Sequence, residues 1–203
     1  MNSVVRIPLT TNPEQAAQLV ALQTAFAQVC NALAPLVQKT RCWNRVALHH
    51  MAYRSLREQF PGMGSQMVCN AIYSVSRASR LVFQHPASPF HLSRLGDRAL
   101  PLLQFAPSCP VYFDRHTLSV KGGRLSMYTL DGRLRFDLAL GAVDEAGFRD
   151  RKLREIVLAR RADQVFELSF TFADPAEDDT ELSGATAETA GEIPEYVMVE
   201  EVT

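Results

Sequence analysis

The spacing of apolar residues changes near residue 111, and this change constrains the fold more than any other feature of the chain. Between residues 19 and 82, apolar side chains recur every three or four positions, which is the spacing of amphipathic helices. From residue 111 to residue 172, apolar and polar residues alternate, as in strands with one buried face. We therefore expect an α+β protein, in which a helical bundle accompanies a small antiparallel β-barrel.

Two helices are predicted before residue 61. The first begins at Asn12-Pro13-Glu14, which supplies a cap, a proline at the first helical position and an acid in the first turn. Pro35 is expected to kink or end this helix, because proline lacks a backbone N–H. The second helix begins near Asn44 and is stopped by Pro61-Gly62.

A third helix is expected to be capped by Ser65 and to continue until Pro86. The three helices can pack as a small bundle. Residues 86–109 lose the helical period and contain four prolines. They are predicted to form an irregular connector with at most one helical turn.

The second half of the chain contains short runs of alternation joined by tight turns. The turns are Gly122-Gly123, Asp131-Gly132 and Ala162-Asp163-Gln164, and glycine supplies the positive φ that tight hairpins require. The predicted strands are residues 111–113, 117–121, 124–130, 133–140, 155–161 and 165–172.

A further alternating run, residues 4–9, precedes the helices and reads as a strand. Two arrangements are open. In one, this first strand joins the later sheet, and the helices are an insertion between strands. In the other, it is a free N-terminal strand.

Charge is divided unequally along the chain. All 21 Lys and Arg residues precede residue 162, whereas residues 174–203 carry ten acids and no base. The remaining twelve acids leave residues 1–173 with a net charge of +9, and most of these cations are Arg, whose rigid fork suits phosphate groups. A polyanionic partner such as nucleic acid and a merely solvated basic surface both fit this charge. The acidic segment is predicted to be disordered, except that residues 193–199 have the pattern of a short docking strand.

Several classes of protein are not expected. No run approaches the ~20 apolar residues that span a bilayer, and no secretory signal opens the sequence, so a cytoplasmic location is predicted. The cysteines are too far apart for a Cys-x-x-Cys metal site, and His49-His50 cannot both reach one ion from a helix. No nucleophile, acid–base pair or phosphate-binding loop is recognisable, so no cofactor and no catalytic residue is predicted.

Basic and aromatic residues of the predicted helices and hairpins are the candidate nucleic-acid contacts, because cations track phosphates and exposed rings stack on bases. Individually, each Arg reads as a solvated surface residue, and only the set carries weight. The set is Arg41, Arg45, Tyr53, Arg57, Arg77, Arg80, Arg115, Lys121, Arg124, Arg133 and Arg135.

Two blocks of sequence have a more specific character. One comprises residues 48–60 (LHHMAYRSLREQF), Pro61-Gly62 and residues 65–81 (SQMVCNAIYSVSRASRL). The other is residues 111–136 (VYFDRHTLSVKGGRLSMYTLDGRLRF), with an Asp-Arg run and a Leu-Asp-Gly-Arg turn. With residues 5–9, residues 13–15 and Asn31, they resemble the N-terminal half of transposon-encoded TnpB proteins. These RNA-guided nucleases are also called OrfB-type transposases and are related to compact type V CRISPR effectors.

The resemblance spans residues 3–172 and implies a particular layout. Residues 1–11 and 110–173 would form a wedge β-barrel, and residues 12–85 an inserted helical recognition lobe, joined by residues 86–109. In that family these lobes hold the guide RNA scaffold, the target-adjacent motif and the guide–target heteroduplex, mainly through backbone shape and charge. The matching positions that would make such contacts are Tyr53, Arg57, Asn70, Ser74, Arg77, Arg115 and Lys121.

The sequence also departs from the family pattern. The RuvC-like carboxylates and the zinc ribbon of the nuclease half have no match here, and residues 85–109 lack the usual Lys/Arg-rich stretch. We therefore expect a module that binds structured RNA, RNA–DNA hybrid or target DNA without cleaving it. It would act with a separately encoded nuclease subunit or as a regulator.

Two other interpretations remain. The chain is a truncated transposase relic or a protein-docking subunit, in which the acidic tail covers the basic surface as a nucleic-acid mimic. Alternatively, it is an enzyme whose site has no recognisable pattern.

Overall fold

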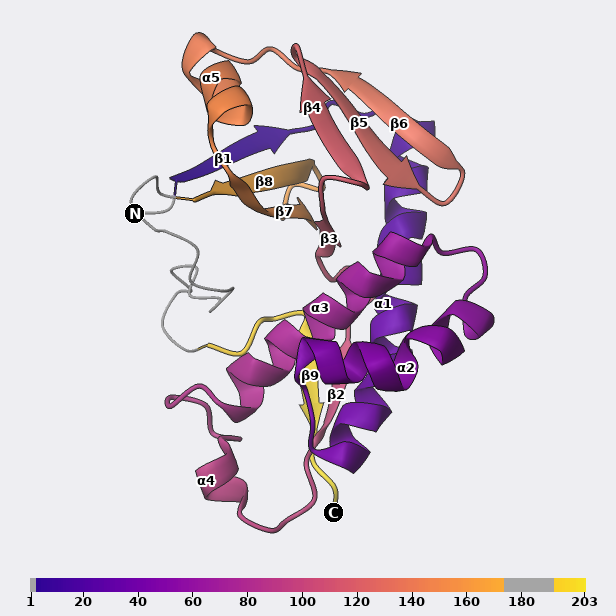
Figure 1. The fold of residues 1–203 in the computed structure, drawn as a ribbon, viewed down its shortest axis with the longest axis vertical. Coiled ribbons are helices and arrows are strands. Elements are labelled where there is room, and N and C mark those ends of the chain that lie inside the picture. The colour runs from indigo at the N-terminus through magenta and orange to yellow at the C-terminus, as the bar shows by residue number, and fades with distance from the viewer. Residues whose placement is uncertain (1–2, 174–191) are drawn as a thin grey trace. The chain divides into compact units, whose positions relative to one another are not determined.

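The computed structural model describes residues 3–173 and 192–203 and groups them into two compact units (Figure 1). Unit 1 comprises the described residues of Met1–Leu22 and Pro110–Ala187, and unit 2 those of Gln23–Cys109 and Glu188–Thr203. Helices and antiparallel strands are both present, which confirms the predicted α+β class. The disorder predicted for the acidic tail falls largely on residues 174–191, which lie outside the described residues.

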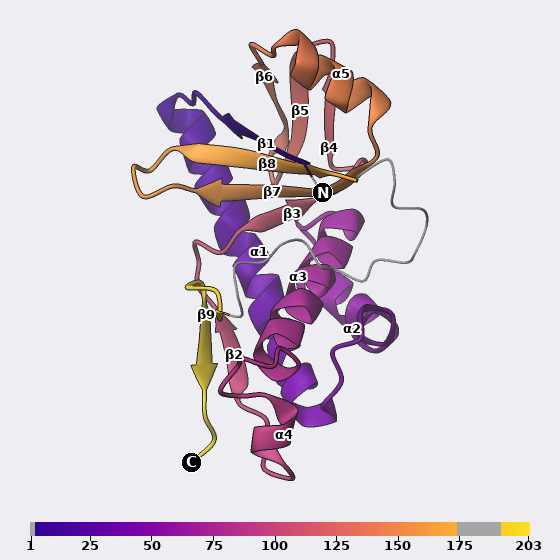
Figure 2. The same cartoon turned by 90° about the vertical axis from the view of Figure 1, so that its left-hand side faces the viewer.

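A four-stranded antiparallel sheet organises unit 1 (Figure 2). Its strands, in spatial order, are β1 (Ser3–Pro8), β8 (Phe166–Phe172), β7 (Leu153–Arg160) and β3 (Val111–Phe113). In this sheet Val5 lies opposite Phe170. The first strand therefore joins the sheet formed after the helices, as one of the two arrangements predicted, and the free-strand alternative is wrong.

Helix α5 (Ala142–Asp150) contacts one face of this sheet through a single aromatic side chain. Its Phe148 ring packs edge-on against Phe170 and Phe172, with centroid separations of 4.8 and 5.2 Å. The helix was not predicted from the sequence. Phe148 is its one aromatic residue, and Gly147 interrupts the helical spacing of apolar residues.

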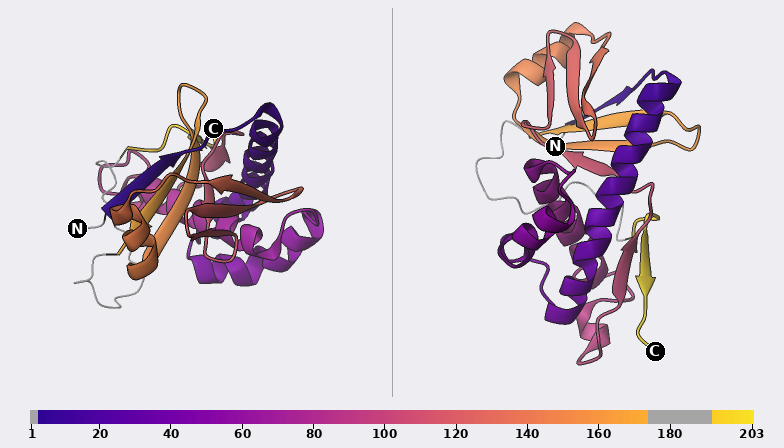
Figure 3. Two further views of the ribbon diagram at one scale, coloured as in Figure 1. Left: turned by 90° about the horizontal axis from the view of Figure 1, so that it is seen from above. Right: turned by 90° about the vertical axis from the view of Figure 1, so that its right-hand side faces the viewer.

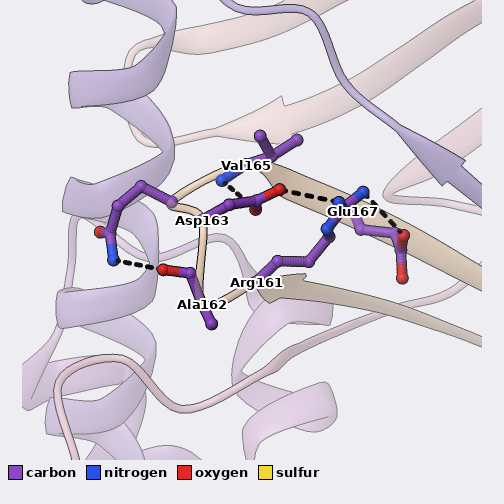
Figure 4. Close-up of polar contacts among 6 residues, drawn as sticks. Arg161, Ala162, Asp163, Val165 and Glu167 are labelled. Carbon is purple, nitrogen blue, oxygen red and sulfur yellow. Dashed lines mark hydrogen bonds and ion pairs between the residues drawn. The ribbon is translucent and has the colours of Figure 1, made fainter.

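The hairpin between β7 and β8 turns where it was predicted, at residues 162–164 (Figure 4). Gln164 adopts a positive φ of 70°, a conformation that polar turn residues tolerate better than branched ones. The Arg161 guanidinium bonds Asp163 at 2.7 Å, and the Asp163 carboxylate accepts the Val165 N–H at 3.2 Å. Glu167 lies 3.6 Å from the same guanidinium, so Arg161 closes the turn between two acids.

A second sheet of unit 1 is a three-stranded meander. It contains β4 (Leu118–Lys121), β5 (Arg124–Thr129) and β6 (Gly132–Asp137), joined at the two predicted glycine turns. Leu125 and Met127 are fully buried on one face. The described strands of unit 1 are thus hydrogen-bonded as a four-stranded and a three-stranded sheet, and closure into a barrel remains a prediction.

The three predicted helices are all present: α1 (Pro13–Thr40), α2 (Arg45–Gln59) and α3 (Ser65–Phe83). The cap predicted for α1 is confirmed, since Asn12 Oδ1 accepts the Gln15 N–H at 2.8 Å. The start predicted near Asn44 is also confirmed, and Asn44 Oδ1 caps α2 by accepting the Ala47 N–H at 3.0 Å. The capping role predicted for Ser65 is wrong. Ser65 is the first helical residue, and Gly64 precedes it without a side-chain cap.

Helix α1 continues through Pro35, so the expectation of an end there is wrong. Proline removes the hydrogen bond to the carbonyl one turn earlier, but Pro35 is exposed and that carbonyl can be solvated. The expectation that no stretch is long and apolar enough to cross a membrane is also wrong for α1, by length and composition alone. Half of its most apolar window is buried, as in a core helix of a globular domain.

The connector of unit 2 is more ordered than predicted. It contains the expected single helical turn, α4 (Leu92–Leu95), but also an unpredicted strand, β2 (Leu102–Phe105). Strand β2 pairs antiparallel with β9 (Val197–Glu200), which confirms a short docking strand near the C-terminus (Figure 3).

Strand β2 and the residues that flank it are held on α1 by three amide side chains. Gln38 donates to the Leu100 carbonyl at 3.0 Å, and Gln23 donates to the Ser108 and Cys109 carbonyls at 3.4 Å. Between them, Asn31 accepts the Phe105 N–H at 2.7 Å and donates to the Phe105 carbonyl at 3.0 Å. The Asn31 amide thus bonds both the N–H and the carbonyl of the buried residue Phe105, as a neighbouring strand would do.

Replacing Asn31 with Ala should destabilise unit 2 by about 2 kcal/mol, because both polar backbone groups of Phe105 lose their partner. The loss is measured by urea unfolding followed through Trp43, the single tryptophan, whose ring is buried in unit 2. Asn31→Asp is the matched control: it keeps the acceptor for the N–H, loses the donor and should give an intermediate value. Equal stability of Asn31→Ala and the original chain would show that water replaces this amide.

Candidate nucleic-acid interface

Four of the predicted contact residues lie on one face of the β4–β5–β6 sheet. The register places Lys121 opposite Arg124, and Arg124 opposite Asp137. On the same face, Arg135 lies opposite Ser126 and Arg133 lies opposite Tyr128. Directly opposed residues of an antiparallel pair share a face, so Lys121, Arg124, Arg133 and Arg135 form one group, which we call the basic face.

Alternation along the strands creates this arrangement. Successive side chains of a strand point to opposite sides, so the burial of Leu125 and Met127 sends Arg124, Ser126 and Tyr128 to the other side. All four cations of the basic face are exposed. Along β6, Arg133 and Arg135 are two positions apart, which corresponds to about 7 Å.

One cation of the basic face is already oriented. The Arg133 guanidinium donates through Nε to the Ser126 hydroxyl at 2.8 Å and through Nη2 to the Ser126 carbonyl at 3.1 Å. These bonds lay the guanidinium along the sheet and restrict its rotamers before any ligand arrives. Less side-chain entropy is then lost on binding.

The basic face has a net positive charge. Asp137 is its one acid, and it lies 3.4 Å from Arg124 in an exposed ion pair that contributes little to stability. Lys121 and Arg124 are directly opposed like charges, a pairing that destabilises a sheet. A sheet arranged only for stability would not favour this pairing.

Sequence reasoning missed three neutral members of this face, namely Ser119, Ser126 and Tyr128. The pairing register was needed to find them. The remaining candidate of unit 1, Arg115, is exposed in the turn between β3 and β4 and does not belong to the face.

In unit 2, several candidates already have partners within the protein. The Tyr53 ring stacks on His49 with centroids 4.6 Å apart, and the Arg57 guanidinium donates to the Met63 carbonyl. Arg45 lies over the Tyr73 ring at 5.9 Å. Arg77 and Arg80 are half-buried on α3.

Three of the predicted contacts are buried or bonded within unit 2. Asn70 and Ser74 are buried, with 8% and 2% of their surfaces exposed, so neither side chain is available to a ligand. Arg41 is exposed, but its guanidinium donates to the Arg98 and Gly96 carbonyls at 2.8 and 3.0 Å. It holds the loop around α4, and we assign it a structural role.

No group of three or more His, Cys, Asp or Glu side chains that could hold a metal ion occurs in residues 3–173 and 192–203. The cysteines are all thiols. Burial raises the pKa of the Cys30 thiol, and the neighbouring Cys109 thiol raises it further, so Cys30 is held in its neutral form.

No family model and no curated protein matches this chain significantly.

Proposed function

We propose that this chain is a nuclease-less, TnpB-like module that binds structured RNA, RNA–DNA heteroduplex or target DNA. It acts beside a separately encoded nuclease half or as a non-cleaving regulator, and it is not itself an enzyme. In this proposal the sheets of unit 1 form a wedge-type β-barrel, and the helices of unit 2 form the recognition lobe.

The observation that carries the proposal is the basic face of the β4–β5–β6 sheet. Four exposed cations share it with a single acid, and Arg133 is oriented in advance by Ser126. Phosphate groups are the ligands that such a surface suits, because Arg presents a planar fork to their oxygens and Lys a compact charge. Contacts of this kind bind a backbone without selecting a sequence.

The proposal predicts salt-dependent RNA binding by the whole chain. Affinity for a labelled structured RNA, measured by fluorescence anisotropy, should fall as salt rises from about 0.05 to 0.2 M, with a log–log slope of about −3 for four phosphate contacts. The whole chain is used because removing residues 174–203 would also remove β9 from its pairing with β2.

A protein of equal size and net charge without a clustered basic face is the control. Binding no tighter than that control, or a slope near zero, would contradict a phosphate-binding role. It would leave the docking-subunit interpretation as the better account.

A further inference from the structure

We infer that the basic face binds a single-stranded segment of nucleic acid, with one base stacked on Tyr128. This inference rests on the proposed function, and it names the form of nucleic acid that this face takes. The segment is an unpaired part of the bound RNA or DNA rather than a duplex.

The first ground is the position of Tyr128. Leu125, Met127 and Phe136 supply the apolar core under this sheet, whereas Tyr128 projects to the opposite side together with the cations. It lies directly across from Arg133 and one step along the sheet from the Ser126–Arg135 pair. An aromatic ring therefore lies within the cationic group, on the side away from the core.

The second ground is the difference between paired and unpaired bases. In a duplex, neighbouring base pairs cover the faces of each base, so a side chain meets only phosphates, sugars and groove edges. In a single strand the face of a base is available, and an aromatic side chain can stack on it. Cations alone suit either form, but cations around a ring favour the unpaired strand.

The third ground is the size and shape of the surface. The strands β5 and β6 each have six residues, or about 20 Å of length, which suits a short run of nucleotides. Along this length the register gives Lys121 and Arg124 at one end and Tyr128 with Arg133 at the other, with Arg135 and Ser126 between. A backbone that follows the cations brings its bases to the ring.

The test compares one strand in two states. A labelled RNA strand of mixed sequence, about 12 nucleotides long, is titrated with the whole chain, first alone and then annealed to its complement. The original chain should bind the free strand more tightly than the duplex. The same sequence as DNA then shows whether the stacked strand is discriminated by its sugar.

Three substitutions isolate the ring. Tyr128→Leu should weaken binding of the free strand about tenfold and leave duplex binding and the salt slope unchanged, because stacking is lost and charge is kept. Tyr128→Phe should bind the free strand within about twofold of the original, since the ring remains. Val143→Ala, at an exposed position of α5 outside the basic face, is the control for a mild surface change.

A fluorescence measurement covers the case in which Tyr128→Leu fails to fold. Tyr128→Trp places an indole at the stacking position, and its emission should be quenched by the free strand and not by the duplex. The buried Trp43 contributes a constant background.

The outcomes separate this inference from the proposed function. Unchanged free-strand binding by Tyr128→Leu, or equal quenching by strand and duplex, overturns the stacking site while salt-dependent RNA binding still stands. Absence of any RNA binding by the original chain overturns both. A selective loss by Tyr128→Leu, with Tyr128→Phe retained, supports both.

Discussion

Replacing Lys121, Arg124, Arg133 and Arg135 together with Gln should reduce the affinity for RNA by about 100- to 1,000-fold at about 0.05 M salt. Each lost phosphate contact removes a released counterion as well as a hydrogen bond, so the salt slope should also fall towards zero. The measurement is the anisotropy titration, repeated across the salt series. The four side chains are exposed, so the sheet should keep its core and its thermal midpoint should change little.

A matched variant controls for net charge. Lys39, Arg54, Arg149 and Arg161 are also four exposed cations, the three arginines lie in ion pairs with acids, and all four belong to other elements. Their replacement with Gln lowers the net charge by the same amount and should reduce affinity less than about tenfold. Equal losses in the two variants would mean that overall charge, and not the basic face, binds the RNA.

Replacing Phe170 with Ala should lower the free energy of unfolding of unit 1 by about 4 kcal/mol. Phe170 is fully buried in a central strand of the four-stranded sheet, opposite Val5 on β1 and Ile156 on β7, and it contacts the Phe148 ring. Its truncation leaves a cavity that β1, β7 and α5 all line, and such cavities cost more than the lost transfer free energy alone. Hydrogen exchange of the β1 and β8 amides measures the effect directly.

Val4→Ala is the control for Phe170→Ala. Val4 belongs to the same sheet, but it points to the other face and is 48% exposed, so its truncation should cost less than about 0.5 kcal/mol. A cost below about 1 kcal/mol for Phe170→Ala would show that α5 and β1 do not pack on this residue as one core.

The elements with strong local signals were predictable from the sequence. Asn12 and Asn44 have the chemistry of helix caps, and the structure uses both in that way. The elements that were missed depend on distant partners. Strand β2 is four residues long and becomes a strand through Asn31 and β9, and α5 is fixed by the contact of Phe148 with β8. The sequence patterns of residues 102–105 and 142–150 themselves do not show these distant contacts.

The candidate site was predictable only as a collection of cations. The register was needed to place Lys121, Arg124, Arg133 and Arg135 on one face, since a shift of one residue would send each side chain to the other side. Burial was needed to exclude Asn70 and Ser74, which share their helix with residues of the core. The local pattern thus identified the cations, and the pairing of the strands determined which of them share a face.

The pairing of β1 with β8 has a consequence for biosynthesis. Strand β1 is made first, but its partner leaves the ribosome only after all of the helices and most of the strands. The apolar residues of β1 have no strand to pair with during that interval. The four-stranded sheet therefore forms late in translation or after it. We expect nascent chains arrested before residue 166 to expose β1 to proteases and chaperones, and chains in which residues 166–172 have left the ribosome to protect it.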